Sequence, residues 1–375
     1  MFGKRITLFK LFGFEVRIDL SWLVLGFLIT WSLAKGIFPG YYKDLPETTY
    51  WWMGVAGALG LFGSIVFHEL AHSLVAKRFG VTMKGITLFI FGGVAEMEDE
   101  PPGPKAEFFM AIAGPLSSVL LGLILYAASS RGENFSMPLH GVLSYLAVIN
   151  FILAGFNLLP AYPLDGGRVL RSILWKWKKN LRWATHRASQ IGSGFGIALI
   201  FFGALNVLRG DIIGGIWQVM IGFFLRNAAQ SSYQQVLIRK SLEGEKVERF
   251  MKKGPVTAPA SLSLQELVED YIYTYHYKMY PVVEMGKLLG CITTRQVKEV
   301  PRERWPQRTV GESLSGCSPE NTVGPGMDAL KALSIMSRTG NSRLMVVDAD
   351  QLIGIISLKD IMGFLSVKFD IGEDQ

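Results

Sequence analysis

The residues best suited to chemistry in this sequence are two histidines and a glutamate, spaced as His68-Glu69-Leu70-Ala71-His72. On an α-helix the two imidazoles lie one turn apart on the same face, so both can bind one metal ion. Glu69 is rotated by about 100° from His68, which lets its carboxylate approach a water molecule beside the ion without being a ligand. This spacing predicts a zinc hydrolase, with a third ligand from elsewhere in the chain and the glutamate as general base.

The motif lies inside an apolar run from Trp51 to Ala76, which is long enough to cross a bilayer. The alternative to metal binding is a pair of histidines whose ring nitrogens are bonded to backbone carbonyls in a helix bundle. Burying a glutamate and two histidines in a membrane helix is costly, however, and such residues usually mark functional sites. We therefore favour the metal-binding interpretation.

A third ligand is offered by the segment 157–168, which reads NLLPAYPLDGGR. Pro160 and Pro163 interrupt the helix, and the freed backbone groups need a protein-lined or water-filled cavity at membrane depth. Asp165 lies in this break, so we expect its carboxylate to bind the zinc and to leave the fourth position for water. The alternative is a surface turn, which the same residues also allow. Asn157 is either a hydrogen-bond donor to a developing oxyanion or a polar contact between helices, and both interpretations stay open.

These residues must be positioned by membrane helices, because half of the 375 residues are hydrophobic and most of the apolar runs precede Arg226. We predict six spans, at about residues 20–38, 51–76, 108–128, 142–159, 191–208 and 212–225. Lysine and arginine concentrate before the first span, after the second and after the fourth, so both termini are expected in the cytoplasm of a multi-pass protein of the cell membrane. The zinc would then lie about 13 Å from the cytoplasmic end of its helix.

The net charge of +7 is explained by these membrane-flanking loops, so we expect no nucleic acid as a partner. The two cysteines, Cys291 and Cys317, lie in the polar half of the chain and are expected as free thiols in a reducing cytosol.

A short β element is predicted beside the second span, because the apolar, β-branched segment from Thr82 to Val94 contains three glycines. An exposed strand edge near the zinc could pair with a substrate segment that has been unwound from its helix. The alternative is a re-entrant loop that only fills the bundle.

The motifs together resemble the site-2 protease family of intramembrane zinc metalloproteases. The resemblance extends from about Leu8 to Arg226 and rests on the segments HELAH (68–72), NLLP (157–160), PLDGG (163–167), FGGVA (91–95) and AGP (113–115). It implies His68, His72 and Asp165 as ligands of one catalytic Zn²⁺ and Glu69 as the catalytic base. It also implies a substrate that is itself a membrane protein, cut in or near a transmembrane segment within the lipid bilayer. We see no PDZ-like insertion between the spans, which departs from one branch of the family.

The second half of the chain contains a repeat with an offset of 64 residues, since 280–283 corresponds to 344–347 and 289–297 to 353–361. Each copy reads as helix, strand, short turn, strand, helix. This pattern resembles a tandem CBS module over about residues 247–367, with repeats at about 247–300 and 310–367. Such modules often bind ATP or another adenine nucleotide, and they also form homo-oligomers.

The resemblance places the nucleotide at Ser357 and Asp360, where the aspartate would hold the ribose hydroxyls. The first repeat departs from this pattern, because Gln296 stands at the corresponding position. The alternative is a structural dimerisation module in which Asp360 only caps a helix.

The sequence therefore predicts a polytopic α-helical membrane protein of about six transmembrane helices with a short β element, followed by a soluble α/β tandem CBS domain. The expected divisions are a protease core at 1–226, a linker helix at 227–246 and the CBS module at 247–375. The expected function is zinc-dependent intramembrane proteolysis in a regulatory pathway, with the module responding to a nucleotide. The alternatives are a CBS-regulated transporter or channel and a catalytically inactive membrane scaffold.

Overall fold

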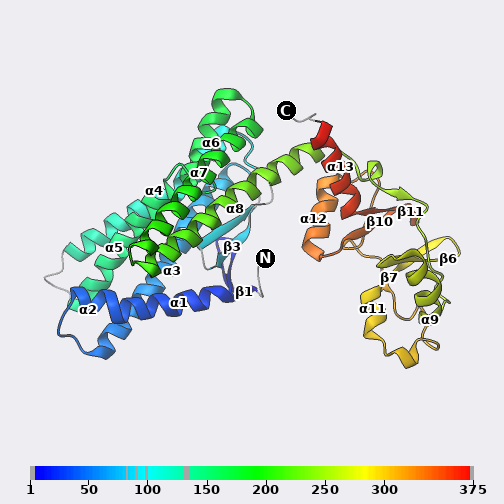
Figure 1. Ribbon diagram of the computed structural model, residues 1–375, viewed down its shortest axis with the longest axis horizontal. Helices are drawn as coiled ribbons and strands as arrows, with labels where there is room; N and C mark the ends of the chain where they lie inside the picture. Colours follow the sequence, from blue (N-terminus) through cyan, green and yellow to red (C-terminus); the bar gives the residue numbers. More distant parts are fainter. Residues whose placement is uncertain (1–4, 82, 90–91, 98–99, 131–135, 372–375) are drawn as a thin grey trace. The chain divides into compact units, whose positions relative to one another are not determined.

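The computed structural model describes residues 5–81, 83–89, 92–97, 100–130 and 136–371. The chain divides into two compact units, Met1–Gln234 and Gln235–Gln375, shown in Figure 1. This division falls inside the range 227–246 that we assigned to a linker helix. The division of the protein into functional domains stays a prediction.

The first unit contains six helices that are long and apolar enough to cross a membrane, which confirms the predicted polytopic fold among the described residues. The first is a continuous helical segment made of α1 (Leu20–Ser32), the π-helical turn η1 (Leu33–Ile37) and α2 (Phe38–Tyr41). The others are α3 (Glu47–Arg78), α4 (Pro104–Ser130), α5 (Met137–Asn157), α7 (Leu181–Leu208) and α8 (Ile212–Leu242).

The segment after α5 contains a helix that the sequence analysis did not predict, α6 (Asp165–Lys178). We interpreted this segment as a break at the two prolines followed by a loop rich in lysine and arginine. Its apolar residues nevertheless recur at helical spacing, so it folds as an amphipathic helix. The residues that this helix buries are Gly166, Gly167, Arg171 and Ser172. Gly167 is required at its start, since an added Cβ would lie 2.2 Å from the backbone nitrogen of Tyr162.

A four-stranded sheet lies beside the helices, with the order β1 (Arg5–Leu11), β2 (Phe14–Asp19), β3 (Met83–Phe89) and β4 (Gly92–Met97). The antiparallel pair β3–β4 confirms the predicted β element, although Thr82 and residues 90–91 lie outside the described residues. The N-terminal pair β1–β2 was not predicted; β2 joins β3 in parallel. Val16 on β2 and Ile86 on β3 pack with Val66 and Leu70 of α3, so the sheet supports the helix that carries the histidines.

Contacts between helices complete the first unit. Helix α4 packs against α3, α5 and α6, which places it at the centre of the elements that carry the predicted site. Helices α7 and α8 approach closely through glycines: an added Cβ at Gly196 would lie 2.7 Å from the carbonyl oxygen of Gly222. Small residues of this kind allow membrane helices to pack backbone to backbone.

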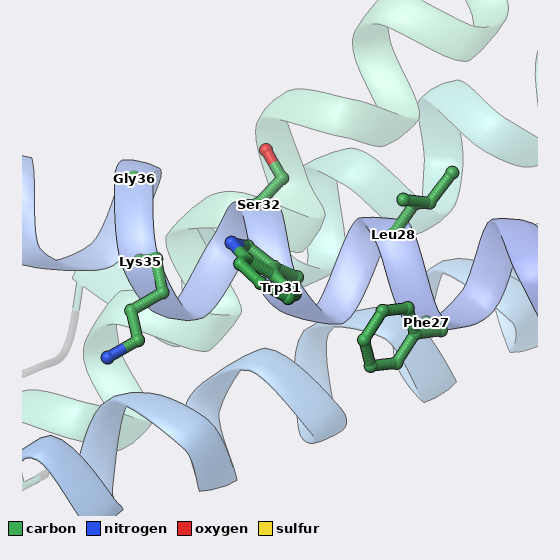
Figure 2. A pocket seen from close by; sticks show the side chains of 6 residues that line it. All are labelled: Phe27, Leu28, Trp31, Ser32, Lys35 and Gly36. Atoms are coloured by element: carbon green, nitrogen blue, oxygen red, sulfur yellow. The ribbon is translucent and has the colours of Figure 1, made fainter.

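An apolar groove with a volume of about 600 Å³ lies along α1 and η1 (Figure 2). Its lining consists of Phe27, Leu28, Trp31, Ser32, Lys35 and Gly36. Figure 2 shows that these side chains come from one continuous helical segment. None of them is a predicted site residue, so the groove is separate from the candidate metal centre.

The second unit contains the predicted repeat. The first copy comprises α9 (Leu264–Glu266), η4 (Leu267–Ile272), α10 (Tyr273–Tyr275), β6 (Met279–Glu284), β7 (Lys287–Thr293) and α11 (Thr294–Glu299). The second comprises α12 (Ala329–Thr339), β10 (Arg343–Asp348), β11 (Gln351–Ser357) and α13 (Leu358–Ile371). Short strands β5 (Lys252–Lys253), β8 (Ser315–Gly316) and β9 (Thr322–Val323) complete two sheets, of order β5-β11-β10-β9 and β6-β7-β8.

The two hairpins have the same register, which confirms the internal repeat. Met279 pairs with Thr293 in the first copy, and Arg343 pairs with Ser357 in the second. Each copy has its own buried core, and a smaller cluster that includes Cys291 and Met345 joins the two.

Candidate metal centre

The structure brings the three predicted ligands together. His68 and His72 come from α3, and Asp165 is the first residue of α6. The Nε2 atoms of the two histidines lie 3.1 Å apart, and each lies 3.1 Å from Oδ2 of Asp165. All three side chains are largely buried, so the donors form a small triangle that is shielded from solvent.

This triangle fits a zinc ion. Tetrahedral zinc with bonds of about 2.0–2.1 Å holds its ligands about 3.3 Å from one another, close to the separations seen here. The Nδ1 atom of His72 lies 2.6 Å from the carbonyl oxygen of Met110, which can only accept a hydrogen bond. His72 therefore carries its proton on Nδ1 and directs the Nε2 lone pair at Asp165. A lone pair facing a carboxylate oxygen at this distance is repulsive unless a metal ion or a proton lies between them.

His68 is oriented in a similar way by a different partner. Its Nδ1 atom lies 2.9 Å from the hydroxyl oxygen of Ser118, a fully buried residue of α4. The hydroxyl can accept from Nδ1, so Nε2 of His68 is also free to act as a ligand. The sequence analysis missed both Met110 and Ser118, because contacts between helices leave no mark in the spacing of the motif itself.

Gly114 of α4 keeps the space in front of the donors open. An added Cβ at this position would lie 2.1 Å from Nε2 of His72 and 2.5 Å from Nε2 of His68. No side chain fits there, so the space beside the two donor atoms exists only because residue 114 is glycine. Its sequence signal is a Gly-Pro pair inside an apolar helix, where neither residue favours the helix.

The two remaining residues of the predicted protease site lie on α3 and α5. Glu69 directly follows the first histidine on α3 and is half-buried. Asn157 is the last residue of α5, and its amide Nδ2 donates a hydrogen bond to the carbonyl oxygen of Leu153, 3.0 Å away in the same helix. The catalytic roles of both residues stay predictions.

At the predicted nucleotide site, Ser357 is the last residue of β11 and Asp360 lies in the first turn of α13. The Ser357 hydroxyl donates to the Asp360 carboxylate, and Nζ of Lys252 lies 3.1 Å from Oδ1 of the same carboxylate. Burial raises the pKa of Asp360, but the hydrogen bonds from Ser357 and Lys252 outweigh this effect and hold the pKa below its usual range. These contacts agree with the helix-capping alternative, and they leave nucleotide binding a prediction.

At the corresponding position of the first repeat, Gln296 is hydrogen-bonded to neighbouring residues of the second unit. The backbone nitrogen and hydroxyl of Thr293 both donate to Oε1 of Gln296, and Nε2 of Gln296 donates to the carbonyl oxygen of Ser313 and the hydroxyl of Ser315. The glutamine amide is therefore engaged, and it carries no charge.

Comparisons with known proteins match both halves of the chain. The profile of "Peptidase family M50" matches residues 56–137 and 132–203, and the profile "CBS domain" matches residues 247–303 and 317–367. The chain is 32% identical to Rip3 of Mycobacterium tuberculosis over 366 residues, which are 96% of this chain and 93% of that protein. It is 31% identical to the zinc metalloprotease MJ0392 of Methanocaldococcus jannaschii over 366 residues, which are 96% of both.

Among solved structures, the site-2 protease from Methanocaldococcus jannaschii is 32% identical to this chain. The match covers 61% of this chain and 94% of that one, with a TM-score of 0.45.

Proposed function

Since the chain belongs to peptidase family M50, the site-2 protease family of intramembrane zinc metalloproteases, we propose that it hydrolyses a peptide bond in or near a transmembrane segment of another membrane protein. The observation that supports this proposal most directly is the buried triangle of two imidazole nitrogens and one carboxylate oxygen, with Glu69 beside it on a membrane helix. The family favours a peptidase over the transporter or channel alternative. The presence of Glu69 argues against an inactive scaffold.

In this proposal, His68, His72 and Asp165 hold the zinc, and each of the other polar residues has one task. When bound, the zinc supplies Lewis-acid chemistry that polarises a carbonyl and acidifies a water molecule. Glu69 accepts a proton from the attacking water and later delivers it to the nitrogen of the leaving amine. Asn157 uses one N–H of its amide on Leu153, and the second donates to the oxygen of the tetrahedral intermediate.

The scissile segment must be extended when it is cut, because a helix protects each peptide bond within its own hydrogen bonds. Strand β4 lies at one edge of the sheet, next to β3, and it packs beside α3. We infer that an unwound substrate segment adds to this edge as a further strand. The main-chain hydrogen bonds would then hold the substrate without demanding a particular sequence.

We also propose that the second unit binds one adenine nucleotide, at Ser357 and Asp360, and that this binding regulates proteolysis. The single site per chain follows from Gln296, whose amide is engaged with Ser313 and Ser315. From the distribution of lysine and arginine we infer that this unit and both termini lie in the cytoplasm. We also propose that the CBS modules form a homo-oligomer.

The proposal is tested with the purified full chain in lipid vesicles and a fusion protein that carries a transmembrane segment. Complete removal of metal with a chelator should abolish cleavage, and stoichiometric zinc should restore it. Mass spectrometry of the products should place the cut in or near the membrane segment. Cleavage that continues after complete metal removal would refute the metallopeptidase mechanism.

A further inference from the structure

One face of α4 lies against both histidines of the candidate metal centre. Glu107, Met110, Gly114 and Ser118 lie within about 80° of one another around the helix axis, because they are spaced by three, four and four residues. Met110 contacts His72, Ser118 contacts His68, and Gly114 keeps the space between the donors open. The first member of this stripe, Glu107, contacts no histidine in the interactions described above, so its presence there needs a separate explanation.

Glu107 is paired with an arginine in the interior of the first unit. Oε1 of Glu107 accepts a hydrogen bond from Nε of Arg171 at 2.5 Å. The exposed fractions of the two side chains are 0% and 2%. Nη1 of Arg171 donates to the hydroxyl of Tyr162 at 3.0 Å, and Nη2 lies 3.4 Å from a carboxylate oxygen of Glu100. The guanidinium also lies over the ring of Tyr162, with 5.0 Å to the ring centre.

These contacts enclose the segment that carries the third metal donor. Tyr162 lies three residues before Asp165, and Arg171 lies six residues after it on α6. Arg171 therefore ties both sides of Asp165 to α4, the helix that also orients the two histidines. The donors come from α3 and α6, and this ion pair is one link between α6 and α4, the helix that packs against α3.

Stability alone gives a weak reason for such a pair. Removing two charges from water costs free energy that their mutual attraction often fails to return. Within the described residues, the second carboxylate oxygen of Glu107 is buried and has no hydrogen-bond partner, which adds to that cost. A fixed position of α6 relative to α4 is a benefit that an apolar contact would provide less well, since the paired hydrogen bonds of an arginine also set direction.

We propose that Glu107 and Arg171 are positioning residues, which hold the carboxylate of Asp165 at the distance from His68 and His72 that the metal requires. This inference rests on the proposed zinc site and adds the mechanism by which its two halves are aligned. Groups that bond directly to metal ligands commonly lower metal affinity about 10- to 100-fold when they are removed. Glu107 and Arg171 act one contact further from the donors, so we expect a loss at the lower end of this range, about 10-fold, for Glu107→Gln and for Arg171→Lys, which keeps the charge but loses the fork geometry.

The test measures zinc affinity of the full chain in lipid nanodiscs by competition with a chelator of known affinity. Ser118→Ala, which removes the hydroxyl beside His68, is the positive control. Lys35→Gln is the matched control, because Lys35 also forms an ion pair between two elements, with Glu47, but far along the chain from the donors. The thermal unfolding temperature of the metal-free proteins is measured as well, because it reports a loss of stability that is separate from a loss of zinc affinity.

The double variant Glu107→Gln with Arg171→Lys further distinguishes a positioning role from a purely structural one. Because each residue acts through the other, the double variant should lose about as much zinc affinity as either single variant. Tyr162→Phe is the mildest change, because it removes only the hydroxyl that accepts from Arg171, and it should also lower zinc affinity, but by a smaller factor. It keeps the test decisive if the charge variants fail to fold.

Unchanged zinc affinity in variants that unfold at lower temperature would overturn the inference and make the pair a structural contact only. That result leaves the proposed function standing, because the unaltered protein would still bind zinc. If the unaltered protein binds no zinc, the proposed function fails, and the inference fails with it.

Discussion

Each histidine of the candidate metal centre is oriented by a hydrogen-bond partner on α4 that leaves its Nε2 atom facing the centre. The carbonyl oxygen of Met110 accepts from Nδ1 of His72 and the hydroxyl of Ser118 accepts from Nδ1 of His68, so both Nε2 atoms face Oδ2 of Asp165. The sequence was sufficient to predict the two histidines and Asp165 as neighbours, because their residue types and positions in apolar segments are unusual. It was insufficient for Met110 and Ser118, whose roles come from the packing of α4 on α3.

Gly114 gives the sharpest prediction at this scale. In Gly114→Ala the added methyl group would occupy the space beside both Nε2 atoms, so the purified variant should contain almost no zinc and should not cleave substrate. Metal analysis by mass spectrometry measures the zinc. Gly63→Ala is the control, since an added Cβ at Gly63 on α3 meets nothing within 4 Å and should leave the zinc content unchanged. Stoichiometric zinc in Gly114→Ala would show that the metal lies elsewhere.

At the scale of helices and strands, the elements that could be predicted are those whose sequence pattern lies within one continuous run of residues. The six apolar helices and the β3–β4 hairpin were recognisable from runs of residues, as was the 64-residue repeat. The N-terminal hairpin was missed because its place in the sheet depends on the parallel pairing of β2 with β3, which are far apart in the chain. Helix α6 was missed because an amphipathic helix of this length is not apolar enough to be recognised as a span, and the two prolines before it indicate a break.

The beginning of α13 carries the prediction that belongs to this scale. Asp360→Ala removes the carboxylate that would hold the ribose hydroxyls, so ATP binding by the full chain should weaken strongly, as measured by calorimetry. The unaltered protein should bind one nucleotide per chain, because Gln296 occupies the other position. Asp348→Ala, which changes an exposed carboxylate at the end of β10, should bind as the unaltered protein does. Two equivalent sites per chain would contradict the role given to Gln296.

At the scale of the whole molecule, α8 belongs to both units. It runs without interruption from Ile212 to Leu242, across the division between residues 234 and 235. We propose that a nucleotide in the second unit changes the position of this helix and thereby the rate of proteolysis. A ligand can shift such an equilibrium only by the difference in its affinity for the two states. Tight ATP binding with an unchanged rate of cleavage would leave the module as an element of assembly.

Membrane topology is the second prediction at this scale. Single cysteines are placed at Lys179, after α6, and at Ser136, before α5, in a chain that lacks Cys291 and Cys317. In sealed vesicles of known orientation, an impermeant thiol reagent should label position 179 from the cytoplasmic side and position 136 from the opposite side. Labelling of both positions from the same side would contradict the assignment that the basic loops indicate.

The central claim is that the triangle of His68, His72 and Asp165 holds a catalytic zinc ion while Glu69 moves the proton. Two variants separate these roles in one experiment, in which zinc content and cleavage of a transmembrane substrate are measured on the same preparations. Glu69→Gln should retain zinc and lose cleavage, because it removes the base and spares the ligands. Asp165→Ala should lose both zinc and cleavage, because it removes a ligand. Full zinc content in Asp165→Ala, or undiminished cleavage by Glu69→Gln, would contradict this account.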